Sequence, residues 1–464
     1  MDSRLLRSLQ EIVGPGNLAT APEELLCYAY DASGMNYPPA AVVFPGSTAE
    51  VSAIMRLATE ARLPVIPRGA GSGVTGGALA VAGGLILVMS RFNRILEIDR
   101  ENQVAVVEPG VITGQFQAAV SKLGLFYPPD PASRNFCTIG GNVAECAGGP
   151  SAVKYGVTRD YVLGLEVVLP DGAIMQTGVR TAKGVVGYDL TRLFVGSEGT
   201  LGVITKIIVR LLALRIKKNT FLVLAGSLAR ATGLVARLLT AGILPCTLEY
   251  MDRTALGVVA GLLPEPFPAG VEALLLIEVD GDEQSVAAQS DRLRQFLAEQ
   301  PGILDIRQAA TQAEIDALWA ARRAISPATF QLKPHKISED VVVPRTKIPD
   351  LVDFTEILAR ELGLTILTFG HAGDGNIHVN IMLNREDPQE LARAEMAKKR
   401  LFEHVLQLAG TISGEHGIGL TKAAYLPLEL QETNIRIMRG LKNLFDPHDI
   451  MNPGKIFPAV DPLA

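Results

Sequence analysis

The sequence predicts an α+β protein of two or three domains, and three observations lead to this prediction. The chain has 464 residues, more than a single hydrophobic core usually accommodates. Hydrophobic residues make up 48% of it and charged residues only 20%, which is typical of globular enzymes and excludes a largely disordered chain. Short β-rich runs alternate with helical stretches and glycine-rich turns between residues 41 and 214, a pattern typical of mixed α/β domains.

One helix is well defined near the start of this first region. Residues 47–50, Ser-Thr-Ala-Glu, form a capping box, in which the serine and the glutamate satisfy backbone N–H groups at a helix start. The periodic segment VSAIMRLATEAR follows, so the helix should begin at Ser47. A change in composition at residues 217–219 indicates a second region, which ends near Ala424.

A glycine-rich loop, PRGAGSGVTGG, occupies residues 67–77 and contains the G-x-G-x-x-G pattern of dinucleotide-binding folds. The next segment contains Gly83-Gly84 and becomes β-rich, so no helix begins in the loop and a nicotinamide site is disfavoured. Backbone N–H groups can instead form a concave nest around a diphosphate, with Arg68 adding charge. A flexible surface loop explains this segment equally well.

Two further glycine-rich stretches lie at residues 138–156 and 195–205, each beside β-like sequence. Three such loops in one α/β domain favour close backbone approach to a large flat ligand that carries phosphates.

Five motifs, in this order, resemble the FAD-linked oxidases of the vanillyl-alcohol oxidase and p-cresol methylhydroxylase superfamily. The branch they most resemble contains the flavin subunit of glycolate oxidase, FAD-dependent D-lactate dehydrogenases and D-2-hydroxyglutarate dehydrogenase. The motifs are PRGAGSGVTGG, YPPDPAS (127–133), TIGGN (138–142), VGSEGTLGVIT (195–205) and NPGKIF (452–457).

The resemblance implies a domain organisation. It predicts an FAD-binding α/β domain in two parts, of the p-cresol methylhydroxylase type, and a substrate (cap) domain built on an antiparallel sheet with helices. The FAD-binding domain should cover residues 1–217, the substrate domain with a metal site residues 218–424, and residues 425–464 should return to the FAD-binding domain.

The resemblance also implies which residues hold the cofactor. FAD should be non-covalent, because Ser72 stands where some relatives carry the histidine that binds FAD covalently. Cys146 departs from the asparagine usual in this branch, so no role is carried over to it. The implied FAD-binding residues are Pro67, Arg68, Gly69, Ala70, Gly71, Ser72, Gly73, Thr75, Ser133, Thr138, Gly141, Asn142, Glu198, Gly202, Ile204 and Asn452.

Two histidines flank a turn in the segment GHAGDGNIHVN, residues 370–380. Asp374-Gly375 is a type I′ hairpin signal, which predicts that His371 lies directly opposite His378. Opposed residues share one face of the hairpin with Cβ atoms about 4.5–5.5 Å apart, so both rings could bind one metal ion. Asn380 should point the same way. On this segment alone, an exposed hairpin with functionless histidines is the alternative.

The segment SGEHGIG, residues 413–419, adds a carboxylate beside a third histidine. Two histidines and one carboxylate with open positions form a recurrent catalytic site for Zn, Fe(II) or Mn. The resemblance assigns His371, His378 and Glu415 as ligands of a divalent metal, commonly zinc, and His416 as the catalytic base. The other histidines are expected to be structural or solvated: His335, His404 and His448.

A second capping box, residues 311–314, starts a helix that should run until Pro327. Its apolar stripe continues through Arg322 and Ser326. A buried guanidinium needs an anionic partner, which is either a structural carboxylate or, as the resemblance implies, the substrate carboxylate. The implied substrate-binding residues are Arg322, Ser326, Lys336 and Asn380.

These residues predict an FAD-dependent dehydrogenase that oxidises a D-2-hydroxy acid, such as D-lactate or glycolate, to the 2-oxo acid. The metal would lower the pKa of the hydroxyl, His416 would take its proton, and Arg322 would orient the Cα–H toward flavin N5. A metal-dependent hydrolase is one alternative, but it leaves the glycine loops unexplained. A non-catalytic FAD electron-relay subunit is another, but it does not need Arg322 or the metal-binding residues.

Composition limits partners and location. The net charge is −6 without a Lys/Arg block, so nucleic acid is not an expected partner. The four cysteines form no Cys-x-x-Cys pair and are expected to be reduced. No signal-peptide h-region is visible, and the longest apolar run, residues 255–263, is too short to span a bilayer. We expect a cytoplasmic protein. The sequence is also compatible with membrane association through a partner subunit and with an oligomer. It is equally compatible with an electron-transfer flavoprotein or an iron–sulfur subunit as electron acceptor.

Overall fold

A computed structural model describes residues 1–263 and 267–458, and the chain divides into two compact units. The first unit contains residues 1–147, 157–214 and the segment from Glu415 onward, and the second contains residues 148–156 and 215–414. The sequence predicts changes of domain at residues 217 and 424, and its predicted C-terminal segment ends with residues 459–464, which lie outside the described part. The roles assigned to these domains stay predictions.

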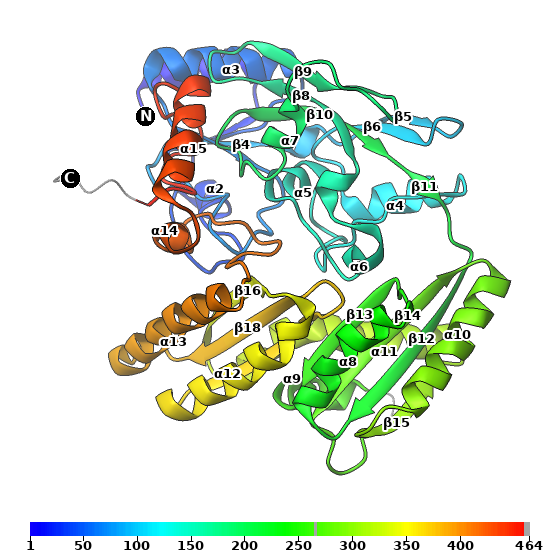
Figure 1. Cartoon of the computed structure of the whole chain (residues 1–464). Helices are drawn as coiled ribbons and strands as arrows, with labels where there is room; N and C mark the ends of the chain where they lie inside the picture. The colour runs from blue at the N-terminus through cyan, green and yellow to red at the C-terminus, as the bar shows by residue number, and fades with distance from the viewer. Residues whose placement is uncertain (264–266, 459–464) are drawn as a thin grey trace. The chain divides into compact units, whose positions relative to one another are not determined.

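The first unit has two main sheets (Figure 1). Its helices are α1 (Ser3–Val13), α2 (Pro22–Leu26), α3 (Thr48–Ala61), α4 (Thr113–Ser121), α5 (Ile139–Glu145), α7 (Leu190–Phe194), α14 (Leu426–Glu429) and α15 (Glu432–Phe445). Its strands are β1 (Leu18–Ala19), β2 (Ala41–Val43), β3 (Val65–Arg68), β4 (Leu85–Val88), β5 (Ile95–Asp99), β6 (Val104–Val107), β7 (Leu125–Phe126), β8 (Val162–Val168), β9 (Ile174–Gly178), β10 (Val203–Arg210) and β11 (Leu212–Ala213).

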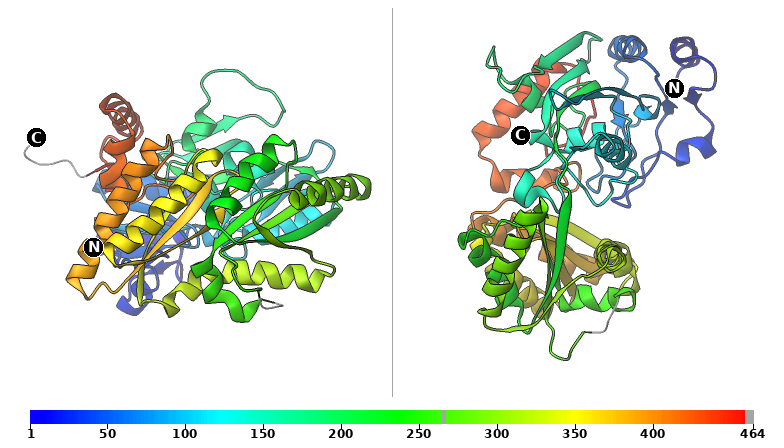
Figure 2. Two further views of the ribbon diagram at one scale, coloured as in Figure 1. Left: turned by 60° about the horizontal axis from the view of Figure 1, so that its bottom comes forward. Right: turned by 90° about the vertical axis from the view of Figure 1, so that its right-hand side faces the viewer.

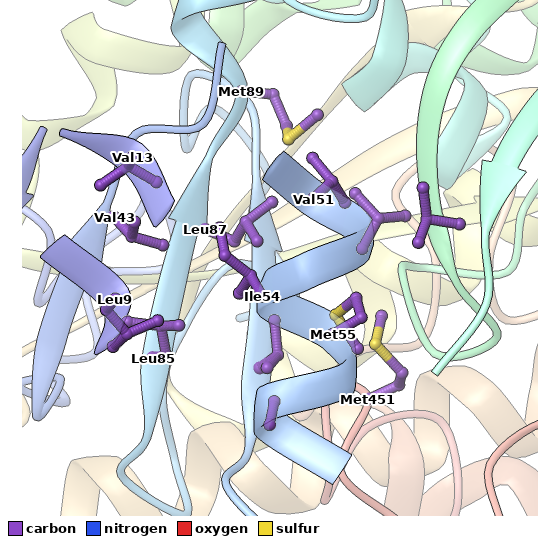
Figure 3. Packing of buried hydrophobic residues seen from close by; sticks show 14 of the residues in the cluster. Leu9, Val13, Val43, Val51, Ile54, Met55, Leu85, Leu87, Met89 and Met451 are labelled. Atoms are coloured by element: carbon purple, nitrogen blue, oxygen red, sulfur yellow. The ribbon is translucent and has the colours of Figure 1, made fainter. Parts of the chain in front are cut away.

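The smaller of these sheets has the order β1-β2-β4-β3, in which β2, β4 and β3 are parallel and β1 is antiparallel. Apolar side chains of α1 and α3 pack on it, as Figure 3 shows for Leu9, Ile54 and Leu85. Met451, from the C-terminal segment, belongs to the same core, so this segment is part of the first unit. The larger sheet is antiparallel, with the order β5-β6-β10-β8-β9, and β7 pairs with β11.

The predicted start of α3 is confirmed. Ser47 is the N-cap residue, and its hydroxyl accepts a hydrogen bond from the backbone N–H of Glu50 at 3.2 Å. The carboxylate of Glu50 accepts from the backbone N–H of Gly46. Both bonds satisfy N–H groups that have no partner within the helix, which is why the capping box marks this end.

The second unit is built on one antiparallel sheet of order β15-β12-β14-β13-β17-β18-β16. Its strands are β12 (Lys217–Ala225), β13 (Thr247–Asp252), β14 (Ala273–Gly281), β15 (Ile303–Gln308), β16 (His335–Val342), β17 (Thr365–His371) and β18 (Asn376–Leu383). Its helices are α6 (Ala152–Tyr155), α8 (Leu228–Thr240), α9 (Arg253–Val259), α10 (Glu283–Ala298), α11 (Gln312–Ala328), α12 (Ile348–Leu362) and α13 (Pro388–Gln407).

Helices cover both faces of this seven-stranded sheet, as the right-hand view of Figure 2 shows. Helices α9 and α11 pack on the face that carries Met251, Phe369 and Met382. Helix α13 packs on the opposite face against Ile337 and Ile381, on the side where α8, α10 and α12 also lie. The predicted antiparallel sheet with helices is therefore confirmed.

The hairpin of β17 and β18 differs in register from the prediction. His371 pairs with Asn376 and Phe369 pairs with His378, so the loop has four residues, 372–375, and not two. The predicted direct opposition of His371 and His378 is wrong. The shift is two residues, an even number, so both histidines still point to the same face of the sheet.

The predicted start of α11 is confirmed, because Thr311 is its N-cap residue and accepts from the backbone N–H of Glu314. Its predicted end is wrong: the helix continues through Pro327 to Ala328. A proline in the last turn removes only one hydrogen bond, which the terminal geometry tolerates. None of the helices in residues 1–263 and 267–458 has the length and apolar character needed to cross a membrane.

Candidate functional site

The first glycine-rich loop exposes a run of backbone donors. Within the described residues, the N–H groups of residues 70–75 donate no hydrogen bond. Gly71 has φ 68° and Gly76 has φ 83°, values that residues with side chains rarely adopt. As predicted, no helix begins in this loop, and β4 follows it. Consecutive free N–H groups form the kind of nest that binds a diphosphate.

The Arg68 side chain binds the backbone around this loop. Its guanidinium donates to the backbone carbonyl oxygens of Tyr30 (2.8 Å), Ala78 (3.3 Å) and Tyr28 (3.4 Å). A Cβ on Gly71 would lie 2.2 Å from a guanidinium nitrogen, so only glycine fits above the arginine. Burial lowers the pKa of Arg68. The guanidinium is therefore committed to backbone carbonyls and shapes the loop.

The second glycine-rich stretch lies against the first. Thr138 is the N-cap residue of α5 and accepts from the backbone N–H of Gly141 at 3.2 Å. A Cβ on Gly69 would lie 2.5 Å from the Thr138 hydroxyl, so the two loops touch through glycine. Asn142 is buried and donates to Thr113 at 2.8 Å. Ser133 lies in the preceding turn, where its carbonyl accepts from the N–H groups of residues 136 and 137.

Asn452 joins the third glycine-rich stretch to the first. Its side-chain amide donates to the carbonyl oxygens of Gly77 and Glu198, both at 2.8 Å. Gly202 packs so closely on β8 that a Cβ would lie 2.7 Å from Val167, and Ile204 pairs with Val167 in the sheet. The structure thus brings together three distant segments that carry residues assigned to FAD, through the approach of Gly69 to Thr138 and the bonds of Asn452.

The segment that carries Glu415 and His416 begins the last part of the first unit and packs on the first glycine loop. The Thr75 hydroxyl donates to the carbonyl oxygen of His416 at 3.1 Å. The Thr75 carbonyl accepts from the backbone N–H of Leu420 at 2.8 Å. The predicted base is therefore tied to the loop that is predicted to hold the FAD pyrophosphate.

Two buried carboxyl groups lie beside this segment. Glu198 accepts from the backbone N–H groups of Ile418 (2.8 Å) and Gly419 (2.7 Å), and burial raises its pKa despite these bonds. Burial, together with the negative charge of Glu198, raises the pKa of Glu145 well above its usual range. Within the described residues, Oε2 of Glu145 has no hydrogen-bond partner.

In the second unit, the sheet face that α11 covers brings the two predicted metal-binding histidines together. The ring centroids of His371 and His378 are 5.2 Å apart with an interplanar angle of 84°, and both side chains are buried. The Nδ1 atom of His371 lies 2.6 Å from Oε1 of Glu249. A carboxylate only accepts, so Nδ1 of His371 carries the proton in this contact.

Arg322 points from α11 onto the same face. Its Nε donates to Oε2 of Glu249 at 2.7 Å, its Nη2 lies 2.6 Å from the same oxygen, and its guanidinium lies 4.8 Å from the ring centre of Phe369. Among the described residues, Nη1 has no hydrogen-bond partner. Burial raises the pKa of Glu249, but its interactions with His371 and Arg322 outweigh this effect and lower it. Arg322 thus has a structural carboxylate on one side and a free donor on the other.

Asp340 plays a similar part beside the second histidine. It pairs with His378 across β16 and β18, and its Oδ1 lies 3.8 Å from Nδ1 of His378. It also accepts from the side-chain amide of Asn376 and from the backbone N–H of Gly414. Glu415 and His416 follow Gly414 directly in the chain.

Asn380 is the next residue after His378 on this face of β18. It is fully buried, and neither Nδ2 nor Oδ1 has a partner within the residues that the structure describes. A buried amide without partners costs about 1–3 kcal/mol. Such a group indicates a place where a polar ligand completes the hydrogen bonding.

Ser326 and Lys336 are also brought together. The Lys336 ammonium donates to the Ser326 hydroxyl at 2.7 Å and to its carbonyl oxygen at 2.9 Å. Burial lowers the pKa of Lys336 to about 8.

The remaining histidines occupy other environments, in line with their predicted structural or solvated roles. His335 accepts from the backbone N–H of Arg385, His404 stacks on Phe354 with ring centroids 3.9 Å apart, and His448 is exposed. All four cysteines are free thiols.

Sequence reasoning missed Glu249 and Asp340. Each is an acidic residue inside a β-rich run, TLEYMD and SEDVVVP, where its side chain is expected to be buried. The argument that a buried arginine needs a partner applies equally to a buried carboxylate. Applied to these runs, it would have found both.

Comparisons with known proteins identify the family of this chain. Residues 216–456 match the C-terminal domain of FAD linked oxidases, and residues 39–178 match an FAD binding domain. The chain is 43% identical to "Glycolate oxidase subunit GlcD" of Bacillus subtilis (strain 168), over 97% of this chain and 96% of that protein. It is 35% identical to "D-lactate dehydrogenase" of Anaerostipes hadrus, over 90% of this chain and 89% of that protein.

Among solved structures, p-cresol methylhydroxylase with substrate bound superimposes with a TM-score of 0.80, at 17% identity, over 98% of this chain and 96% of the other. This confirms the predicted fold. The chain belongs to the FAD-linked oxidases, in the family that includes glycolate oxidase subunit GlcD and D-lactate dehydrogenase.

Proposed function

We propose that this protein is an FAD-dependent dehydrogenase that oxidises a D-2-hydroxy acid, such as D-lactate or glycolate, to the 2-oxo acid. Family membership supports a flavin-linked oxidation, and the names of the relatives point to small hydroxy acids as substrates. The observation that carries the proposal is one sheet face, where the His371 and His378 rings lie close to each other. Nη1 of Arg322 and the amide of Asn380 lie on the same face, and neither has a partner among residues 1–263 and 267–458.

The glycine loops fit FAD. The free N–H groups of residues 70–75 suit a diphosphate, and Asn452 holds the first and third loops in place. Ser72 provides no imidazole for a covalent link, so non-covalent FAD is proposed. When bound, FAD supplies the acceptor for the two electrons and the hydrogen that leave Cα of the substrate.

A divalent metal is proposed at these histidines, zinc first, with iron or manganese as alternatives. His371 and His378 would each offer a ring nitrogen, and Glu415, next to Gly414, would offer a carboxylate. When bound, such an ion supplies Lewis acidity that lowers the pKa of the substrate hydroxyl.

The chain's own residues would bind and orient the substrate. Arg322 would donate through Nη1 to the carboxylate, and the amide of Asn380 would complete its hydrogen bonds with the ligand. Ser326, one turn further along α11, and Lys336 of β16, which donates to it, would assist. His416 would accept the hydroxyl proton on a ring nitrogen, which leaves the loss of hydrogen from Cα as the remaining change.

Several partners fit this function. An electron-transfer flavoprotein or an iron–sulfur subunit is proposed as electron acceptor, and the word "subunit" in the GlcD name is consistent with a complex. We propose a cytoplasmic location, with membrane association through such a partner as the alternative.

The test is anaerobic reduction of the bound flavin, followed by absorbance, across a panel of D- and L-2-hydroxy acids. We expect bleaching by a small D-acid and not by its L-enantiomer. His416→Ala should slow bleaching by about 100-fold or more with a smaller effect on substrate affinity, because a positioned base contributes about 10²–10⁴-fold. His448→Ala, at an exposed histidine, is the matched control and should behave like wild type. No bleaching by any acid would reject the proposal and favour an electron-relay subunit.

A further inference from the structure

Glu249 lies between two groups that the proposed function uses separately. It is a fully buried residue of β13, and each of its carboxylate oxygens has a different partner. Oε1 lies 2.6 Å from Nδ1 of His371, and Oε2 accepts from Nε of Arg322 at 2.7 Å. The same carboxylate therefore binds a proposed metal ligand and the proposed carboxylate clamp.

The strand pairing places this contact. Tyr250 pairs with Gly370 across β13 and β17, so Glu249, within β13, lies beside His371, the last residue of β17. Arg322 comes from α11, which packs on this face of the sheet. Three elements thus meet at one side chain.

We propose that Glu249 is a positioning and specificity-determining residue that holds His371 for the metal ion and neutralises Arg322, so that a carboxylate binds well only when the ion is also bound. This rests on the proposed function. A histidine that binds a metal through one nitrogen usually donates its other N–H to such a carboxylate, and loss of that partner typically costs about 10–100-fold in metal affinity.

The charge balance gives the specificity. With Glu249 ionised, its charge cancels that of Arg322, and a simple carboxylate entering the buried site brings an uncompensated negative charge. A divalent ion reverses this balance. A 2-hydroxy acid can contact the ion through its hydroxyl and Arg322 through its carboxylate. It is therefore favoured over acids that lack the hydroxyl.

Two opposing effects act on carboxylate binding when Glu249 becomes Gln. Gln holds the Arg322 guanidinium less firmly, which weakens binding of a carboxylate. Gln also carries no negative charge to neutralise Arg322, which strengthens binding of a carboxylate. The substitution removes the repulsion between the Glu249 carboxylate and the ligand carboxylate. Like charges about 7 Å apart at an effective dielectric constant of about 20 repel by more than the equivalent of tenfold in affinity. The charge effect should win.

The experiment compares Glu249→Gln with wild type at about pH 8. Zinc affinity is measured by competition with a chromophoric chelator, and propanoate affinity is measured by calorimetry on the metal-free holoprotein. We expect Glu249→Gln to bind zinc about 10–100-fold more weakly and propanoate at least about tenfold more tightly. A residue that only stabilises the fold would not move the two affinities in opposite directions. Unchanged zinc affinity, or propanoate affinity that does not rise, would overturn the proposal.

Glu278→Gln is the matched control. Glu278 is a buried glutamate on the neighbouring strand β14, and it also contacts α11, by accepting from Trp319 at 2.8 Å. Neither affinity should change in this variant. If Glu249→Gln does not fold, Arg322→Met tests the same balance from the other side and should bind zinc more tightly; weaker or equal zinc binding would then contradict the proposal.

Failure of the proposed function gives a different result. In that case wild type itself takes up no zinc, or no 2-hydroxy acid bleaches its flavin. If wild type does both and only the Glu249 variant departs from expectation, the error lies in the role of Glu249.

Discussion

Asn380 and Asn376 allow a direct test of whether this sheet face is built for a ligand. Both are buried asparagines of β18 that point to the same face, four residues apart. The Asn376 amide donates to the Asp340 carboxylate and to the Val341 carbonyl, whereas the Asn380 amide has no partner in the described part of the chain. Substitution of each by Ala deletes the same atoms, so a difference in stability reports their hydrogen bonds.

The magnitudes follow from these contacts. Asn376→Ala loses one bond to a charged acceptor, about 1.5–3 kcal/mol, and one to a neutral acceptor, about 0.5–1.5 kcal/mol, so its free energy of unfolding should fall by about 3 kcal/mol. Asn380→Ala leaves a small cavity but removes an unsatisfied amide that costs about 1–3 kcal/mol, so it should stay within about 1 kcal/mol of wild type.

The assay is thermal unfolding of the metal-free protein, followed by tryptophan fluorescence. The single tryptophan, Trp319, lies in α11, so its fluorescence reports on the second unit. Asn376→Ala should lower the melting temperature by roughly 6–12 °C, and Asn380→Ala by no more than roughly 4 °C. An equal loss in both variants would show that the Asn380 amide is bonded within the protein, and would refute its assignment to the substrate.

Three further predictions concern other residues. Burial lowers the pKa of Lys336 to about 8, so its ammonium loses its proton as pH rises through about 8. KM for the hydroxy acid should rise there in wild type but not in Lys336→Met. An unchanged pH profile in the variant would show that Lys336 does not bind the substrate. Burial and the charge of Glu198 raise the folded-state pKa of Glu145 above its unfolded value, so the stability linked to this group is lost as pH rises. Glu145→Gln should therefore raise the melting temperature at about pH 8 and make little difference near pH 4. The reverse order would contradict the assignment of a neutral carboxyl. Cys146 has φ 57° and ψ 48°, a left-handed conformation that asparagine adopts more readily. Cys146→Asn should therefore raise the free energy of unfolding by about 1 kcal/mol in a urea titration. A destabilised variant would count against backbone strain at this position.

Local chemistry made part of the fold predictable. The capping boxes at Ser47 and Thr311 placed two helix starts correctly, because the donor and acceptor groups involved are only three residues apart. The hairpin register was missed by two residues, because the pairing of His371 with Asn376 depends on a four-residue loop that a dipeptide signal does not specify. The shared face survived because the error was even.

The candidate site was predictable only where the chemistry of a residue requires a partner. An arginine on an apolar stripe required a partner, but the sequence could not say that this partner is Glu249, which is 73 residues away and reaches it through packing of α11 on the sheet. The left-handed backbone at Cys146 likewise became visible only in the structure, because nothing in the neighbouring sequence specifies it.

The proposed oxidation depends most on a divalent ion at the histidine pair. The direct measurement is the rate of anaerobic flavin bleaching by a D-2-hydroxy acid as a function of bound metal per flavin, in protein stripped with a chelator and then titrated with zinc. We expect the stripped protein to keep its flavin but to bleach at a small fraction of the rate, and zinc to restore the rate in proportion to occupancy up to one ion per flavin. Full bleaching in metal-free protein would contradict the account.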